Sequence, residues 1–162
     1  MKKTLIIFAT FFALVAMIAC NDKTDYKELI VGKWEVQTCY HWYHDFTDES
    51  LSFEEISAPA DTNYIGYDSA EFNADGTSRW HMNDRYVQGG MFTDPFRHFN
   101  WCISEDSLFV YTGTLENAMW KFAIKELDGK NLVVEEYTNN GHQDYSHHHW
   151  EQILRYTFKR ER

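Results

Sequence analysis

The sequence predicts an all-β domain: an up-and-down barrel of eight antiparallel strands, preceded by a short helical turn. Three observations predict it. Apolar and polar residues alternate with a period of two along several segments, as in strands that bury one face. Asp75-Gly76 and Asp128-Gly129 lie between such segments, where tight hairpin turns are expected. Aromatic residues make up 17% of the chain and prolines number only 2, a composition that suits strands better than disorder.

The predicted elements begin with one or two helical turns over residues 25–30, which Gly32 ends. The first strand then places alternate residues on one face, namely Trp34, Val36, Thr38, Tyr40 and Trp42. The same alternation runs through residues 120–125 and 154–159. The eight strands are expected at about 32–42, 64–73, 77–84, 98–104, 108–113, 118–126, 131–138 and 151–160.

The connections differ in length in a regular way. The turns at Asp75-Gly76, at residues 105–107 and at Asp128-Gly129 are tight, and both Asp-Gly pairs are expected to supply a positive backbone angle. In an up-and-down order these three turns fall at one end, and the connections 43–63, 85–97, 114–117 and 139–150 fall at the other. The predicted shape is therefore a cup, whose interior holds side chains or one small ligand. A β-sandwich built from the same strands is the alternative.

The N-terminal segment has the layout of a secretory signal peptide. Lys2 and Lys3 precede an apolar run from Leu5 to Ala19, which is shorter than the roughly 20 residues that a spanning helix needs. We therefore expect a signal peptide over 1–19, a tether over 20–25 and the barrel domain over 26–162. The 143 residues from Cys20 onward suit one domain of ordinary size.

The end of this segment resembles the lipobox of bacterial lipoproteins. Residues Met17-Ile18-Ala19-Cys20 match it, with Met17 in place of the usual leucine. The resemblance implies that Cys20 is acylated, with fatty acids such as palmitate, and becomes the mature N-terminus in the cell envelope. Asn21 favours the outer membrane over the inner membrane. The alternative is an ordinary cysteine behind an ordinary signal peptide.

The barrel segment resembles the bacterial lipocalin-like lipoproteins, a branch of the calycin architecture. Gly32-Lys33-Trp34 is similar to the Gly-x-Trp that opens the first lipocalin strand, where the tryptophan plugs the closed end. Three further short motifs occur in the family's order, at residues 72–77, 120–134 and 156–160. The Thr-Asp-Tyr turn of eukaryotic lipocalins has no counterpart, so the class of ligand does not transfer.

The charge balance excludes several partners. The chain carries a net charge of −10, which becomes −12 once Lys2 and Lys3 are removed with the signal peptide. Binding to nucleic acid needs clustered Lys and Arg, so we expect none. The negative charge also disfavours adhesion to anionic lipid, so we expect the acyl chains alone to hold the protein at the bilayer.

Aromatic residues are the main candidates for ligand contact. Those expected in the upper cavity are Tyr40, Trp42, Trp80, Phe99 and Trp101. The competing interpretation is that these rings fill the barrel and leave no cavity.

Histidines gather toward the elaborated end of the cup, and they are weak candidates for metal ligands. Seven of the 8 lie there by sequence position, with His147 and His149 as the candidate pair. The alternative is that these imidazoles are simply solvated in polar loops.

The carboxylate pairs Glu54-Glu55 and Glu135-Glu136 are interpreted as solvated charge, because neighbours on a strand point to opposite faces. No catalytic motif is present, so we expect a non-enzymatic protein without a cofactor.

Cys39 and Cys102 are expected to remain free thiols, because the strand map places them far apart on strands that are not neighbours.

Three functions follow as hypotheses. The first is binding of a small hydrophobic or amphipathic ligand in the barrel mouth. The second is a filled barrel whose long loops dock a protein partner of the envelope. The third is a metal-dependent role of the histidine-rich rim.

Overall fold

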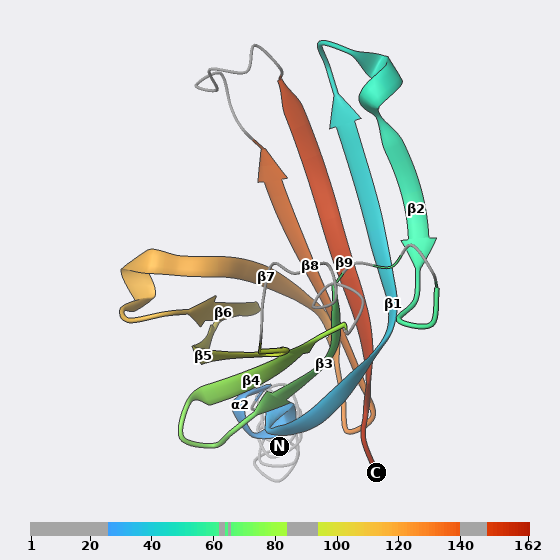
Figure 1. Cartoon of the computed structure of the whole chain (residues 1–162). Helices are drawn as coiled ribbons and strands as arrows, with labels where there is room; N and C mark the ends of the chain where they lie inside the picture. The colour runs from blue at the N-terminus through green and yellow to red at the C-terminus, as the bar shows by residue number, and fades with distance from the viewer. Residues whose placement is uncertain (1–25, 62–63, 65, 84–93, 140–148) are drawn as a thin grey trace, which may run out of the picture.

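The computed structural model describes residues 26–61, 64, 66–83, 94–139 and 149–162. A short helix, α2 (Tyr26–Ile30), precedes the strands, and η1 (Glu49–Leu51) and η3 (Leu115–Asn117) are single 3-10 turns. The strands are β1 (Gly32–Asp45), β2 (Phe53–Ser57), β3 (Tyr67–Phe72), β4 (Thr77–Met82), β5 (Phe96–Ser104), β6 (Ser107–Tyr111), β7 (Ala118–Leu127), β8 (Asn131–Asn139) and β9 (Trp150–Arg160). All of them form one antiparallel sheet (Figure 1). Within the described ranges, no helix is long and apolar enough to cross a membrane.

Eight of these strands close into a barrel, as predicted. The order runs from β1 through β3, β4, β5, β6, β7 and β8 to β9, and β9 pairs again with β1 over Trp34 to Asp45. Because the hydrogen-bonded ring is continuous, the sandwich alternative is wrong. The helical turn before the first strand is also confirmed, at α2.

The ninth strand, β2, lies in the connection predicted over 43–63. It pairs with the upper part of β1, between Cys39 and Tyr43, whereas β3 pairs with the lower part, between Gly32 and Glu35. Its sequence, Phe-Glu-Glu-Ile-Ser, lacks the strict alternation of a half-buried strand, and four of its five residues are exposed. The pattern therefore gave no signal for it.

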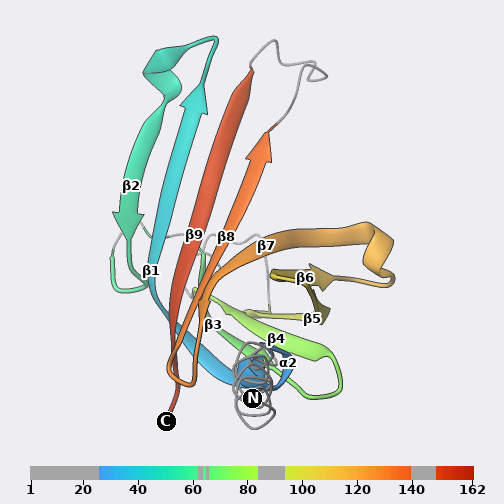
Figure 2. The same ribbon diagram turned by 180° about the vertical axis from the view of Figure 1, so that it is seen from behind.

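The barrel opens at one end into a taller wall. β7 pairs with β8 only over Ala123 to Leu127, where Ala123 lies opposite Glu135. The earlier part of β7, from Ala118 to Ala123, pairs with β6 alone. We call residues 38–45 of β1, all of β2, 136–139 of β8 and 150–155 of β9 the upper wall. Figures 1 and 2 show these four strands rising together above β3 to β7.

A β-bulge in β1 decides which side chains of the upper wall face inward. Val36 pairs with Phe158 and Thr38 with the next residue, Thr157, so Gln37 is an extra residue on β1. Trp34 and Val36 face the core below the bulge. Above it the phase is reversed, and the odd-numbered residues from Cys39 onward share the inner face.

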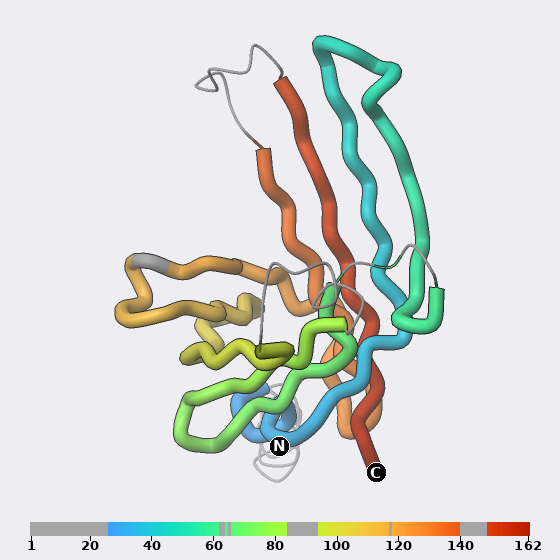
Figure 3. Tube along the Cα trace, in the orientation of Figure 1, coloured from blue at the N-terminus to red at the C-terminus, as the bar shows by residue number. Residues whose placement is uncertain are grey.

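Trp34 closes the base of the barrel. Its side chain is fully buried, its Nε1 donates to the Ile30 carbonyl over 2.7 Å, and the Arg160 guanidinium lies 4.3 Å from its ring centre. Arg160 also donates to the carbonyls of Val31 and Leu29, which ties α2 to the end of β9. Gly32 has φ +133°, and a Cβ there would lie 2.6 Å from Arg160 Nη1, so the position needs glycine. In Figure 3, α2 and the C-terminus lie at this closed end.

The tight turns use different devices. Gly76 has the expected positive φ, 87°, and Glu105 takes φ 54° in the turn between β5 and β6. Gly129 has no positive φ, so that expectation is wrong. The Asp128 carboxylate shapes this turn instead, accepting from the backbone N–H groups of Lys130 at 2.6 Å and Asn131 at 2.7 Å.

Candidate functional site

A small hollow lies at the top of the aromatic core, where the barrel opens. Its volume is about 60 Å³. Strands β3, β4, β7, β8 and β9 contribute its lining, which consists of Tyr67, Trp80, Trp120, Phe122, Glu136, Leu154 and Tyr156. Below the hollow, buried residues such as Phe72, Phe158 and Val110 fill the barrel.

The rings of the hollow hold one another in fixed, differing planes. Tyr67 meets Trp80 edge-on, with ring centres 5.2 Å apart, and meets Trp120 edge-on at 5.8 Å. Trp80 and Phe122 are stacked at 6.4 Å, and Phe122 meets Tyr156 edge-on at 6.5 Å. Such contacts are the favoured geometries of aromatic pairs, so the walls of the hollow are preorganised.

Glu136 brings the only carboxyl group to this lining. It follows Leu132 and Val134 on the inner face of β8 and is 9% exposed. Among the described residues, none forms a hydrogen bond or an ion pair with its carboxylate. Burial raises its pKa from 4.5 to about 7. The interpretation of Glu136 as solvated charge is therefore wrong, although it does face away from Glu135.

Glu135 instead stands on the outer face, between two cations. Its carboxylate lies 3.0 Å from Lys125 Nζ and accepts from Arg155 Nε over 2.8 Å. The two adjacent glutamates thus differ in both face and partner.

The inner face of the upper wall rises from the hollow in ordered rungs. Leu154 pairs with both Glu136 and His41, and the rung above joins Thr138, Gln152 and Tyr43. Aromatic contacts continue outward, with Tyr43 stacked on Phe53 at 5.5 Å and tilted against Trp150 at 5.8 Å. The hollow therefore continues into a wall that carries aromatic rings beside polar side chains.

The predicted ligand residues separate into four places. Trp80 lines the hollow, and Phe99 packs beside it in the core, with its ring centre 5.0 Å from Trp120. Trp101 lies at the closed end, where its Nε1 donates to the carbonyls of Asn73 and Thr77.

The expectation that Tyr40 and Trp42 line the cavity does not agree with the geometry. The bulge at Gln37 turns both to the outer face, where Arg155 lies 5.3 Å from the Tyr40 ring centre and Trp42 stacks with His44. Their places on the inner face are taken by Cys39, His41 and Tyr43.

Several site residues were not proposed as ligand contacts. For four of them the alternation of the strand predicts that the side chain faces inward: Trp120, Phe122, Leu154 and Tyr156. Glu136 also carried a signal, because a carboxylate there continues the apolar series of Leu132 and Val134. Tyr67 carried none, since its strand alternates weakly.

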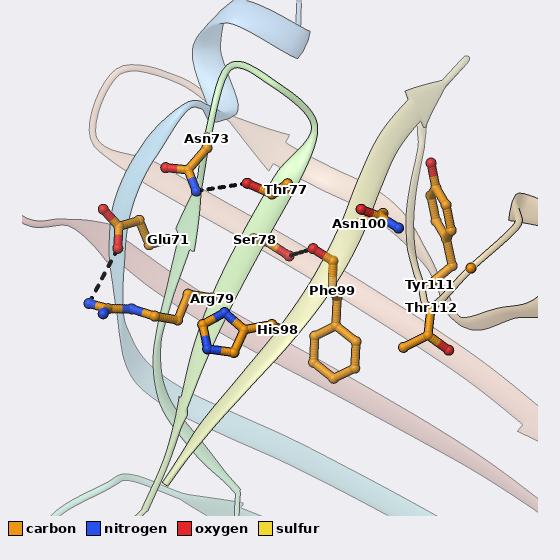
Figure 4. A pocket seen from close by; sticks show the side chains of 11 residues that line it. Glu71, Asn73, Thr77, Ser78, Arg79, His98, Phe99, Asn100, Tyr111 and Thr112 are labelled. Atoms are coloured by element: carbon orange, nitrogen blue, oxygen red, sulfur yellow. Dashed lines mark hydrogen bonds and ion pairs between the residues drawn. The ribbon is translucent and has the colours of Figure 1, made fainter. Parts of the chain in front are cut away.

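A larger hollow, of about 540 Å³, lies over the outer face of β3 to β6 (Figure 4). Its charged groups already have partners: Arg79 lies 3.5 Å from Glu71 and over the Phe96 ring. Asn73 donates to Thr77 in the same groove. The groove is open and polar, and its charged and amide side chains already pair with one another. It is therefore a weaker candidate for a ligand site than the aromatic hollow.

The histidines give no metal centre in the part of the chain that the structure describes, where no three His, Cys, Asp or Glu side chains converge. His149 packs against Phe46, with ring centres 4.9 Å apart, and its backbone N–H donates to Thr47 Oγ1. His147 lies outside the described residues, as does Cys20, the expected lipidation site.

Cys39 and Cys102 are free thiols. Cys39 is buried on the inner face of β1, and burial raises its pKa to about 11. Cys102 lies half-buried on β5, a strand that does not neighbour β1.

Comparison with known protein families, with curated proteins and with solved structures finds no match to this chain. The fold and the site therefore define its class on their own: a closed, eight-stranded antiparallel β-barrel with an aromatic hollow at its open end.

Proposed function

We propose that this chain is a lipid-anchored, lipocalin-like lipoprotein of the cell envelope that binds a small amphipathic ligand at its barrel mouth, without catalysis. The observation that carries the proposal is the hollow between Trp80 and Trp120, because it lies where the barrel opens into the upper wall. Ligand sites are mostly apolar with a few placed polar groups. Five aromatic rings, one leucine and one carboxyl group meet that description.

The size of the hollow limits how a ligand is held. Sites for whole small molecules usually enclose at least roughly 300 Å³, whereas this hollow has about 60 Å³. It therefore accepts one end of a ligand. The remainder lies along the inner face of the upper wall, against Tyr43, Phe53 and Trp150.

The closed base supports the lipocalin-like part of the proposal. Gly32-Lys33-Trp34 was the motif behind the resemblance, and the resemblance implies a tryptophan plug. Trp34 is fully buried at that end, beneath Arg160 and next to α2.

Anchoring through Cys20 would fix the orientation of the barrel. α2 begins at Tyr26, beside the closed base, so a short tether would hold the base near the bilayer and leave the mouth facing away. The test is a Cys20→Ser variant expressed in the native host with labelled palmitate. We expect label and membrane association in the unaltered protein and neither in the variant; equal membrane association of both would contradict the anchor.

Ligand binding is tested with the apolar fluorescent probe N-phenyl-1-naphthylamine. Leu154→Trp fills the hollow, and Tyr137→Trp makes a comparable change on the exposed outer face. We expect the first variant to weaken probe binding roughly ten-fold or more and the second to leave it unchanged. Equal binding by both variants would place the probe elsewhere.

A protein-docking role is the second candidate, and a specific observation favours it. Large apolar side chains are exposed between residues 46 and 56, namely Phe46, Leu51, Phe53 and Ile56, with Ile56 72% exposed. Absence of probe binding, together with capture of one specific envelope protein that Ile56→Glu abolishes, would favour docking over ligand binding.

A further inference from the structure

The carboxylate of Glu136 faces a hollow that offers it no positive charge. The other groups lining the hollow are rings and one leucine. The cations nearest in register, Lys125 and Arg155, are held by Glu135 on the outer face. A buried carboxylate without a partner is costly, which makes Glu136 a candidate for a group that a ligand completes.

The surrounding rings favour a cation over other polar groups. The faces of Trp, Tyr and Phe rings attract positive charge, most strongly where water is excluded. The ring centres of Trp80, Trp120 and Tyr67 lie within 6 Å of one another. The planes of these rings are inclined to one another by 40° to 80°, so ring faces point into the hollow from several directions. Rings together with a carboxylate form the chemistry that recognises an organic ammonium ion.

A second unsatisfied group stands one rung higher. Thr138 lies two residues after Glu136, on the same face of β8, and its Oγ1 is buried without a hydrogen-bond partner among the described residues. It can accept a hydrogen bond. A primary ammonium group has three N–H donors, so it can donate to the Glu136 carboxylate and still have donors left for a neighbouring acceptor.

We propose that the mouth binds a primary alkylammonium ion, with its charged nitrogen against Glu136 and the rings of the hollow, and its alkyl chain along the inner face of the upper wall. The inference rests on the proposed ligand-binding function and adds the charge of the ligand. The volume of about 60 Å³ is about twice the volume of one water in the liquid. It admits the nitrogen and the first methylene groups.

The titratable groups around Glu136 agree with a positively charged ligand. Titratable groups face Glu136 from neighbouring strands: Tyr67 on β3, Cys39 and His41 on β1, and Tyr156 on β9. Burial raises the pKa values of Cys39 and Tyr156 above their ordinary ranges, so both are neutral near pH 7. His41 is one strand beyond Leu154 and hydrogen-bonds Gln152. Glu55, which pairs with His41 from β2, also lies on the inner face of the upper wall, but it is exposed and does not line the hollow. Glu136 is the one carboxyl group among the residues that line the hollow.

The test compares three probes of equal chain length: n-octylammonium, n-octanol and n-octanoate. Each is titrated into the intact mature protein at about pH 8, with tryptophan emission as the readout, since Trp80 and Trp120 line the site. We expect n-octylammonium to bind about ten-fold more tightly than n-octanol, and n-octanoate most weakly. Its affinity should also fall as the pH is lowered through about 7, where Glu136 becomes protonated.

Two variants separate the possible results. Glu136→Gln should remove the preference for n-octylammonium and its pH dependence, while n-octanol binding persists. Glu135→Gln removes the same charge from the outer face and should change neither. If n-octanol binds as tightly as n-octylammonium, and Glu136→Gln changes nothing, the ammonium inference fails while ligand binding stands. If none of the three probes binds, the proposed function itself fails.

Discussion

Glu135 and Glu136 are neighbours in β8, but one carboxylate is neutralised outside the barrel and the other is buried without a partner inside it. Although partial burial opposes the shift, hydrogen bonds from Lys125 and Arg155 hold the pKa of Glu135 below its ordinary value. Burial alone raises the pKa of Glu136 to about 7. The first residue stabilises the sheet, and the second lowers stability in return for a polar group at the mouth.

This contrast gives a prediction about stability and pH. The folded-state pKa of Glu136 is raised, so the folded protein binds more protons than the unfolded chain between pH 4.5 and about 7. Its contribution to the free energy of unfolding is absent below that window and becomes increasingly unfavourable as the pH rises through it. We expect Glu136→Gln to raise the free energy of unfolding by about 1–3 kcal/mol at pH 8 and by much less at pH 4.5.

Urea unfolding at several pH values measures this effect. Glu135→Gln is the matched control and should lower stability by about 0.5–1 kcal/mol, because it breaks a partly exposed ion-pair network. A loss of stability in Glu136→Gln at pH 8 would mean that the carboxylate has a favourable partner in the folded protein.

A second prediction concerns the base. Arg160→Met keeps an unbranched apolar stem but removes the guanidinium over Trp34 and the donors to Val31 and Leu29. We expect a loss of about 1–3 kcal/mol in the free energy of unfolding, since two carbonyl groups lose their partners. Arg162→Met, at the exposed terminus, should lose almost nothing. Equal midpoints of urea unfolding for the two variants would contradict this role of Arg160.

A third prediction separates the two cysteines of the barrel. Cys39 is 7% exposed with a pKa raised to about 11 by burial, whereas Cys102 is partly exposed. The thiolate is the reactive form, so we expect Cys39 to be alkylated about two orders of magnitude more slowly than Cys102 in the folded protein. Peptide mapping after timed alkylation of a Cys20→Ser variant measures both rates. In urea the two rates should converge, and similar rates in the folded state would show that β1 and β9 separate readily.

Much of the barrel followed from local rules. The eight predicted strands fall close to β1 and β3 to β9, because most of them bury one face and carry a period of two, and tight turns bound the others. β2 did not follow, since its residues are largely exposed and its stability comes from pairing with β1. Pairing with a distant edge leaves little trace in a five-residue segment.

The site was harder to predict than the fold, for two reasons. An unbroken alternation from Trp34 to Trp42 predicts that Tyr40 and Trp42 face inward. The extra residue Gln37 reverses the phase, and a bulge of this kind has no sequence signal as clear as a glycine. Glu136 was placed on the correct strand and opposite to Glu135, but its burial depends on rings contributed by four other strands.

The bulge itself gives the last prediction. Deleting Gln37 joins Val36 directly to Thr38, which removes the extra residue and leaves Cys39 and Tyr43 facing inward as before. Deleting His41, in the regular part of the strand, instead turns Tyr43 outward and breaks its contacts with Phe53 and Trp150. We expect the first deletion to cost about 1–2 kcal/mol and the second at least about 3 kcal/mol, because a one-residue slip moves every later side chain to the other face. Circular dichroism and urea unfolding of the two variants measure the difference; equal losses would mean that Gln37 does not set the inward face of the upper wall.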